Sequence, residues 1–194
     1  THDQIEAGLL DLLDKQDQFF KECYEILEDQ IHSNYTLKHY FDVYQLIQDY
    51  WIQAETFEKW SEMLNNFFLP RLELALSHFS TQPNCLESHE NLLKEYVHVL
   101  SDLFALITNY YKGISSKRIE DFKEVLVNVD QDWDINSSSF SIFAISALIS
   151  TTGVAGVLVG MRSVSYVNDV IDALKKKVLI KDRMVTWETV KGLM

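Results

Sequence analysis

One run without charge, Phe140 to Met161, constrains the fold of this chain more than any other feature. Its 22 residues, FSIFAISALISTTGVAGVLVGM, contain no Asp, Glu, Lys or Arg. A membrane-spanning helix needs about 20 mostly apolar residues, because the hydrocarbon core of a bilayer is about 30 Å thick. The run therefore predicts one long apolar helix near the C-terminus, which either crosses a membrane or is buried on all sides in a core.

The charge of the chain differs on the two sides of this run. Residues 1–139 carry 25 acidic and 10 basic side chains, whereas residues 162–194 carry 4 acidic and 7 basic ones. The acidic body argues against a nucleic-acid partner, since phosphate binding needs a basic surface. Basic residues directly after an apolar span are typical of its cytoplasmic side. We therefore predict a single-pass membrane protein with an extracytoplasmic acidic N-terminal body, and a secreted protein as the alternative.

The residues before the run predict amphipathic helices. Apolar side chains recur every three or four positions in segments 5–31, 36–51, 57–69 and 92–111. Thr36 is a suitable N-cap, and the aromatic residues that follow it at helical spacing are expected in the core. Short loops between such helices are typical of a bundle. The predicted fold class is all-α: an antiparallel bundle of four to five amphipathic helices plus the long apolar helix.

Helix-breaking residues set the predicted boundaries. Pro70 is expected to break or kink the third segment, and Ser80 to Asn84 (STQPN) to form a loop. Gly113 occupies the position of a C-cap glycine, after which a further helix would bury Ile119 to Val129. The predicted domains are an acidic helical bundle (1–130), a polar linker (131–139), the apolar helix (140–161), and a basic C-terminal helix and tail (162–194).

Contact with a membrane would divide the side chains of this region into three classes. The apolar ones would face lipid: Phe140, Ile142, Phe143, Ile145, Leu148, Ile149, Val154, Val157, Leu158 and Val159. Three glycines, Gly153, Gly156 and Gly160, would let two helices approach closely. Four basic residues would contact anionic headgroups: Arg162, Lys175, Lys176 and Lys177. The predicted partners are membrane lipid and, through the apolar helix, another protein or a second copy of the chain.

Two alternatives remain for the apolar run. Ser150-Thr151-Thr152-Gly153 can form a turn, which would make a hairpin of two arms, each too short to span a bilayer as a helix. A helical bundle that shelters such a hairpin until it meets a membrane resembles, in architecture, the helical pore-forming toxins of the cytolysin A type. That resemblance implies an all-α protein whose hairpin inserts into the bilayer. In the second alternative, the run is the core helix of a soluble helical domain.

Common catalytic and metal-binding motifs do not occur in the sequence, which has no GxGxxG, P-loop, GxSxG or HExxH. Glu95-x-x-His98 has the spacing of a di-iron bundle, but such a site needs a second pair and two further glutamates. The nearest second pair, Asp29-x-x-His32, has Asp in place of Glu, and His98 with Asp102 has ordinary salt-bridge spacing. We therefore predict no enzymatic activity, no metal site and no cofactor.

Two glycosylation sequons and two cysteines bear on the compartment. Asn34-Tyr-Thr36 and Asn136-Ser-Ser138 fall in predicted loops, which agrees with an extracytoplasmic body. Cys23 and Cys85 have no zinc-site spacing and are expected to be buried thiols, with a disulfide as the alternative in an oxidising compartment.

Three functions are consistent with these observations. We expect a non-enzymatic, membrane-anchored helical protein that binds a protein partner or forms part of a membrane complex. The alternative is a membrane-inserting, pore-forming protein with residues 140–161 as the inserting hairpin. The second alternative is a soluble helical protein-interaction domain.

Overall fold

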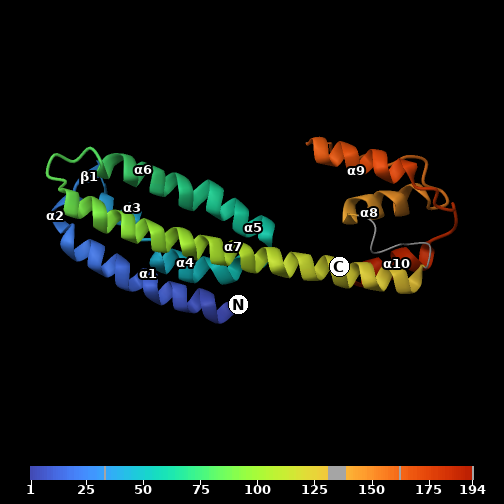
Figure 1. Cartoon of the computed structure of the whole chain (residues 1–194), viewed down its shortest axis with the longest axis horizontal. Helices are drawn as coiled ribbons and strands as arrows, with labels where there is room; N and C mark the ends of the chain where they lie inside the picture. The colour runs from blue at the N-terminus through green and yellow to red at the C-terminus, as the bar shows by residue number, and fades with distance from the viewer. Residues whose placement is uncertain (33, 131–138, 162, 194) are drawn as a thin grey trace. The chain divides into compact units, whose positions relative to one another are not determined.

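The computed structural model describes residues 1–32, 34–130, 139–161 and 163–193. The chain is mostly helical, with 76% of residues in helices and 3% in strands, which confirms the predicted all-α class. It forms two compact units, Thr1–Ser115 and Ser116–Met194. Figure 1 shows the elements of both units, and helix α7 (Glu87–Val129) contributes residues to each.

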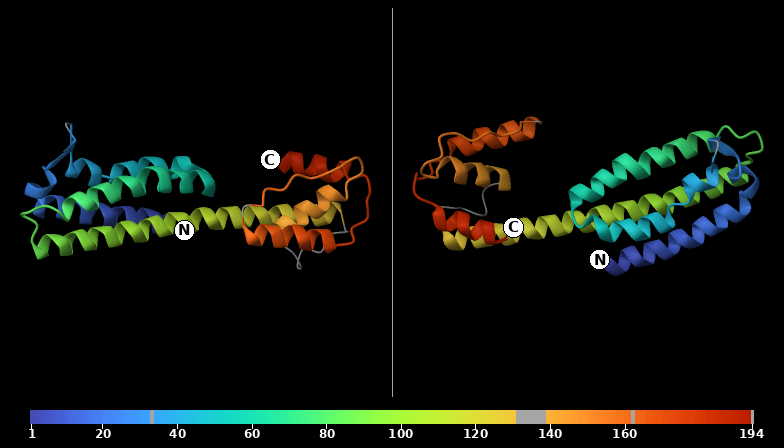
Figure 2. Two further views of the ribbon diagram at one scale, coloured as in Figure 1. Left: turned by 90° about the horizontal axis from the view of Figure 1, so that it is seen from above. Right: turned by 180° about the vertical axis from the view of Figure 1, so that it is seen from behind.

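The first unit consists of helices and one small antiparallel sheet. Besides the first part of α7, its elements are α1 (His2–Glu22), α2 (Tyr24–Leu27), β1 (Gln30–His32), β2 (Tyr35–Thr36), α3 (Leu37–Phe41), α4 (Tyr44–Trp51), the 3-10 turn η1 (Ile52–Ala54), α5 (Phe57–Met63), the π-helical turn η2 (Leu64–Phe68) and α6 (Leu69–Phe79). The views in Figure 2 show α1 and α6 running alongside α7 within this unit.

Aromatic side chains form much of the core of the first unit, as their helical spacing predicts. Phe19 stacks on Tyr96 with ring centroids 5.2 Å apart, and the Tyr96 hydroxyl donates a hydrogen bond of 2.6 Å to the Phe41 carbonyl. The buried Trp60 indole donates to the Thr108 hydroxyl at 3.0 Å. Because each buried polar tip has a partner, these rings contribute apolar area without an unpaired donor.

Three predicted boundaries in this unit are wrong or incomplete. The first helix does not reach Ile31, because the chain after α2 pairs as β1 with β2. Pro70 lies in the first turn of α6, directly after the π-helical turn η2, so the α-helical pattern is interrupted before Pro70 but the chain continues as helix through it. Gly113 does not end a helix, and α7 continues through it to Val129. The loop at 80–84 and the N-cap position of Thr36 are confirmed.

The second unit contains the end of α7 and three shorter helices, α8 (Phe140–Ile149), α9 (Val164–Lys175) and α10 (Met184–Leu193). The predicted long apolar helix is wrong. Residues 140–149 form α8, a turn follows, and residues 154–161 have neither helical nor strand backbone. Among the described residues, no helix is long and apolar enough to cross a membrane.

Candidate functional site

The apolar run folds as a hairpin, which we call the apolar hairpin (residues 140–161). Ser139 caps its helical arm, α8, by accepting a hydrogen bond from the Ile142 amide at 3.3 Å. The second arm, residues 154–161, returns along α8: Val159 packs on the cluster that contains Ile142 and Ile145. Val159 and Gly160 also line one surface pocket together with Ser141 and Ile145. The two short arms agree with the turn that the sequence offers at 150–153.

Hydroxyl groups end the helical arm at this turn. Ser150 Oγ donates to the Ser146 carbonyl at 2.7 Å, and Thr151 Oγ1 donates to the Ala147 carbonyl at 2.8 Å. These side-chain bonds add to the backbone bond that the Ser150 amide donates to the Ser146 carbonyl at 3.2 Å, at the end of the helix where carbonyls begin to lack amide partners. Gly153 then adopts φ of 89°, a left-handed conformation in which a side chain would be strained. The local sequence therefore stops α8 after ten residues.

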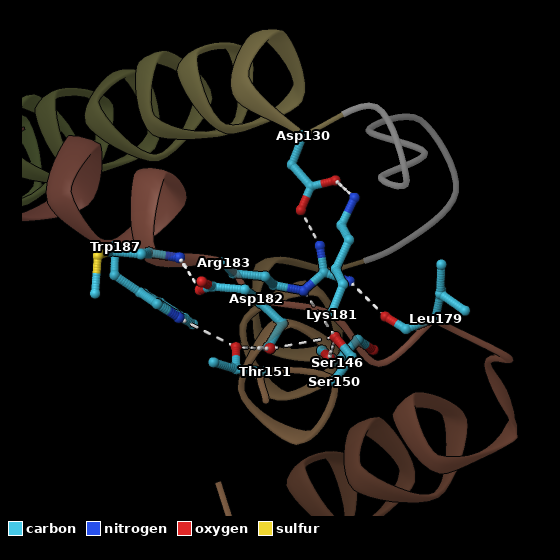
Figure 3. A network of polar contacts seen from close by, with 11 residues as sticks. Asp130, Ser146, Ser150, Thr151, Leu179, Lys181, Asp182, Arg183 and Trp187 are labelled. Atoms are coloured by element: carbon cyan, nitrogen blue, oxygen red, sulfur yellow. Dashed lines mark hydrogen bonds and ion pairs between the residues drawn. The ribbon is translucent and has the colours of Figure 1, made fainter. Parts of the chain in front are cut away.

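A network of polar side chains fixes this turn to the segment before α10 (Figure 3). Asp130, which follows α7, accepts hydrogen bonds from Lys181 Nζ at 2.7 Å and from the Arg183 guanidinium. Arg183 Nε also donates to Ser150 Oγ at 3.1 Å, and the Trp187 indole donates to Thr151 Oγ1 at 3.1 Å. We call these six residues the polar latch.

Backbone hydrogen bonds reinforce the polar latch. Thr151 and Lys181 form an isolated parallel bridge, in which the Lys181 amide donates to the Ser150 carbonyl at 3.1 Å and the Thr152 amide donates to the Lys181 carbonyl at 2.9 Å. The turn of the apolar hairpin is therefore bound through both main chain and side chains to residues about 30 positions later in the chain.

The charged centre of the latch is buried. Asp130 is 4% exposed and Arg183 is 2% exposed, and burial lowers the pKa of the Arg183 guanidinium. A buried charge is tolerated when it is paired and hydrogen-bonded, and removal of one partner then costs about 3–5 kcal/mol. Loss of either partner is thus expected to destabilise the packed state of the hairpin. Beside it, Ser146 Oγ is a buried hydroxyl without a hydrogen-bond partner among the described residues.

Large apolar side chains are unusually exposed around the hairpin. Of the 23 exposed large apolar or tyrosine side chains among the described residues, 13 lie between positions 148 and 185. They are Leu148, Val154, Leu158, Met161, Val164, Tyr166, Val167, Ile171, Leu174, Leu179, Ile180, Met184 and Val185. The second arm contributes three of them, and Leu158 is fully exposed. More than half of the exposed large apolar side chains thus belong to a segment of 38 residues, which makes this segment the candidate interaction surface.

Helix α9 adds a regular apolar stripe to this surface. Val164, Val167, Ile171 and Leu174 recur every three or four residues and are all exposed. A different face of the same helix packs on α8, where Ala173 is fully buried beside Ile142 and Ile145. Only part of the apolar face of α9 is therefore covered within this unit.

The structure divides the predicted membrane-contacting residues into two groups. Ile142, Phe143 and Ile145 are buried, Phe140, Ile149, Val157 and Val159 are half-buried, and Leu148, Val154 and Leu158 are exposed. Gly156 and Gly160 lie in non-helical backbone, so they do not share a helix face as the GxxxG interpretation requires. Gly153 forms the turn.

The predicted headgroup-contacting residues lie at the end of α9. Lys175 is in the last turn and pairs with Asp172 at 2.8 Å, Lys176 is the C-cap, and Lys177 is exposed. Arg162 lies outside the described residues. The run of lysines therefore ends the helix, as its sequence position predicts.

The other candidate residues of the sequence lie elsewhere. Glu95 accepts a hydrogen bond from Lys15 at 3.0 Å, and His98 lies 3.5 Å from Asp102 on the surface of α7. Both residues of the Glu95-x-x-His98 motif therefore contact neighbouring side chains on the surface. Asn34 is exposed in a turn, whereas Asn136 lies outside the described residues. Cys23 is buried and Cys85 half-buried, and both carry free thiols.

Comparison with protein-family models, with curated proteins and with solved structures gives no match for this chain. Its function is therefore argued from the geometry of the apolar hairpin, the polar latch and the exposed surface around them.

Proposed function

We propose that this chain is a membrane-inserting helical protein in which the apolar hairpin enters the bilayer. The observation that carries the proposal is the second arm, where Val154, Leu158 and Met161 are exposed within an uncharged run of 22 residues. Full burial of a leucine side chain stabilises a bound state by about 1.5–3 kcal/mol, so an apolar solvent would favour this arm strongly. A permanent single-pass anchor would need one long helix instead of this hairpin.

The charges around the hairpin support the same proposal. The hairpin itself carries none, whereas residues 162–194 carry 7 basic and 4 acidic side chains. Basic residues beside an apolar segment attract anionic headgroups, by about 1 kcal/mol for each residue near the surface. Lys175, Lys176 and Lys177, at the end of α9, are the densest group of such residues. The acidic first unit would then face water.

The polar latch supplies a reason for the hairpin to stay packed away from a membrane. It holds the turn at Ser150 and Thr151 through the buried Asp130–Arg183 pair. Insertion requires these contacts to break, and the exposed apolar side chains supply a compensating gain only in lipid. A latch that opposes insertion in water and yields to a bilayer would make insertion conditional on membrane contact.

Release of a self-quenched dye from vesicles tests this proposal. The purified chain is added to vesicles of phosphatidylcholine with phosphatidylglycerol, and release is compared for the native sequence and Leu158→Asp. Because Leu158 is fully exposed, the substitution should change folding stability by no more than about 0.5 kcal/mol. A charged side chain inside the bilayer costs about 2.5–3.5 kcal/mol. We therefore expect roughly a 100-fold slower release.

The matched control is Leu10→Asp, which introduces the same charge at an exposed leucine of α1 in the first unit. It should leave dye release unchanged. Equal release by native protein and Leu158→Asp would exclude the hairpin as the inserting element, and absence of release from the native protein would refute the proposed function.

A second candidate function, binding of a protein partner or a second copy, is favoured by one observation. The exposed stripe on α9 has the spacing with which an amphipathic helix binds an apolar groove. This candidate expects association in plain buffer that Ile171→Asp weakens, measured as molar mass by light scattering. Membrane insertion expects Ile171→Asp to leave the molar mass in buffer unchanged.

A further inference from the structure

The second unit contains a cavity that the proposed function does not use. Its volume is about 140 Å³, and it lies among the end of α7, α8 and α10. Leu126, Phe143 and Ala147 form one part of its wall, and Trp187 and Val190 another. The same side chains belong to one apolar cluster, so the inner wall of the cavity is part of a small core.

The lining of this cavity is unsuited to water. No charged residue is among the described residues that line it, and the Trp187 indole N–H already donates to Thr151 Oγ1. Thr186 is the other lining residue with a polar side-chain group. A buried water needs two to four polar partners, whereas an apolar cavity of about 150 Å³ stays dry and accepts a molecule such as benzene. The volume and the chemistry of the lining thus select the same class of ligand.

We propose that this cavity is a binding site for one small apolar group, of about the size of a benzene ring. The cavity is partly open to solvent, which gives such a group a route of entry. Half-buried Ala144 and exposed Leu148, both on α8, are among the lining residues. The site therefore lies on the helical arm of the apolar hairpin.

A ligand in this site also acts on the hairpin, and this part of the inference rests on the proposed function. Anything that binds the packed state but not the inserted state stabilises the packed state by RT ln(1 + L/Kd), where L is the free ligand concentration. The lining residues come from α7, α8 and α10, and they surround the cavity only while α8 packs on the other two helices. The site is therefore lost when the hairpin inserts. An occupied cavity consequently slows insertion.

Titration of the full chain with benzene, followed by ligand-observed NMR, tests the site. Benzene should bind saturably, and benzylammonium, which carries a charge that this lining cannot pair, should bind at least tenfold more weakly. Ala144→Leu places three more carbon atoms at the cavity and should weaken benzene binding at least tenfold. The matched control Ala155→Leu, on the exposed second arm, should leave the affinity unchanged.

Because Ala144→Leu can disturb packing, its thermal unfolding is measured together with that of Ala147→Leu, a second filling variant. A variant that has the same unfolding temperature as the native chain but no longer binds benzene supports the site. Absence of saturable binding to the native chain, or equal binding to both filling variants and Ala155→Leu, overturns it.

Dye release with and without benzene tests the coupling separately. Benzene should slow release by the native chain and have less effect on release by Ala144→Leu, which corrects for benzene dissolved in the vesicles. Binding without any effect on release refutes the coupling and leaves the site standing. Binding by a chain that releases no dye refutes the proposed function alone.

Discussion

Removal of the charge on Asp130 is the most direct perturbation of the polar latch. In Asp130→Asn the side chain keeps its shape, but the buried Arg183 and the neighbouring Lys181 both lose their ion pair with the Asp130 carboxylate. Breaking one side of a buried pair costs about 3–5 kcal/mol, and every 1.4 kcal/mol is a factor of about ten. We therefore expect the equilibrium for opening the turn at Ser150 to rise by roughly 150- to 5,000-fold.

Hydrogen exchange measured by mass spectrometry reads this opening directly. The amides of Ser150 and Thr152 donate to Ser146 and Lys181 carbonyls, and their peptide should lose protection by the same factor in the variant. Glu95→Gln is the charge-matched control. Glu95 forms a partly exposed ion pair with Lys15, and such a surface pair contributes less than about 1 kcal/mol to stability. It should leave exchange around Ser150 unchanged.

A double variant separates the charge from the shape of the latch. If Asp130→Asn acts through the broken ion pair with Arg183, then adding Arg183→Met removes the buried positive charge and should restore part of the lost protection. Protection around Ser150 that is unaffected by Asp130→Asn, or a double variant that is less protected than the single one, would refute the assignment of the buried pair as the latch.

Two further predictions concern the first unit and its continuation along α7. Gly113→Ala should stabilise the chain by about 0.5–1 kcal/mol in chemical denaturation followed by circular dichroism, because Gly113 is inside a helix with open space around it; a loss of stability would indicate a left-handed helix end. Burial raises the pKa of the Cys23 thiol to about 11, so the folded state holds its proton while the unfolded thiol ionises. Stability should therefore fall by up to about 2–3 kcal/mol as pH rises from 9 to 11; burial raises the pKa of Tyr96 as well, so Cys23→Ala should remove only part of this slope.

The helices of the first unit are predictable because apolar periodicity reports burial directly. Ile5, Leu9 and Leu12 recur at helical spacing and are buried on one face of α1, as are Ile47 and Trp51 on α4. The same rule cannot place helix ends. Gly113 permits a left-handed cap but does not require one, and α7 continues through it to Val129.

The candidate site is predictable only in part, for the same physical reason. The turn at Ser150 to Gly153 depends on local chemistry, and hydroxyls with a following glycine indicate it in the sequence. The latch depends on residues 53 positions apart, Asp130 and Arg183, which nothing local connects. A buried arginine among exposed basic residues gives no signal before the fold is known.

The backbone of the second arm limits what the inserted state can be. Residues 154–161 form neither helix nor strand in the packed state, so their amide and carbonyl groups depend on water or irregular partners. In hydrocarbon, every backbone polar group needs an internal partner, which only helices and closed barrels supply. An inserted hairpin must therefore convert this arm to helix, and Gly156 and Gly160, which lie in the irregular arm of the packed state, would then belong to helical backbone. The proposed insertion would therefore require a change of secondary structure as well as release of the latch.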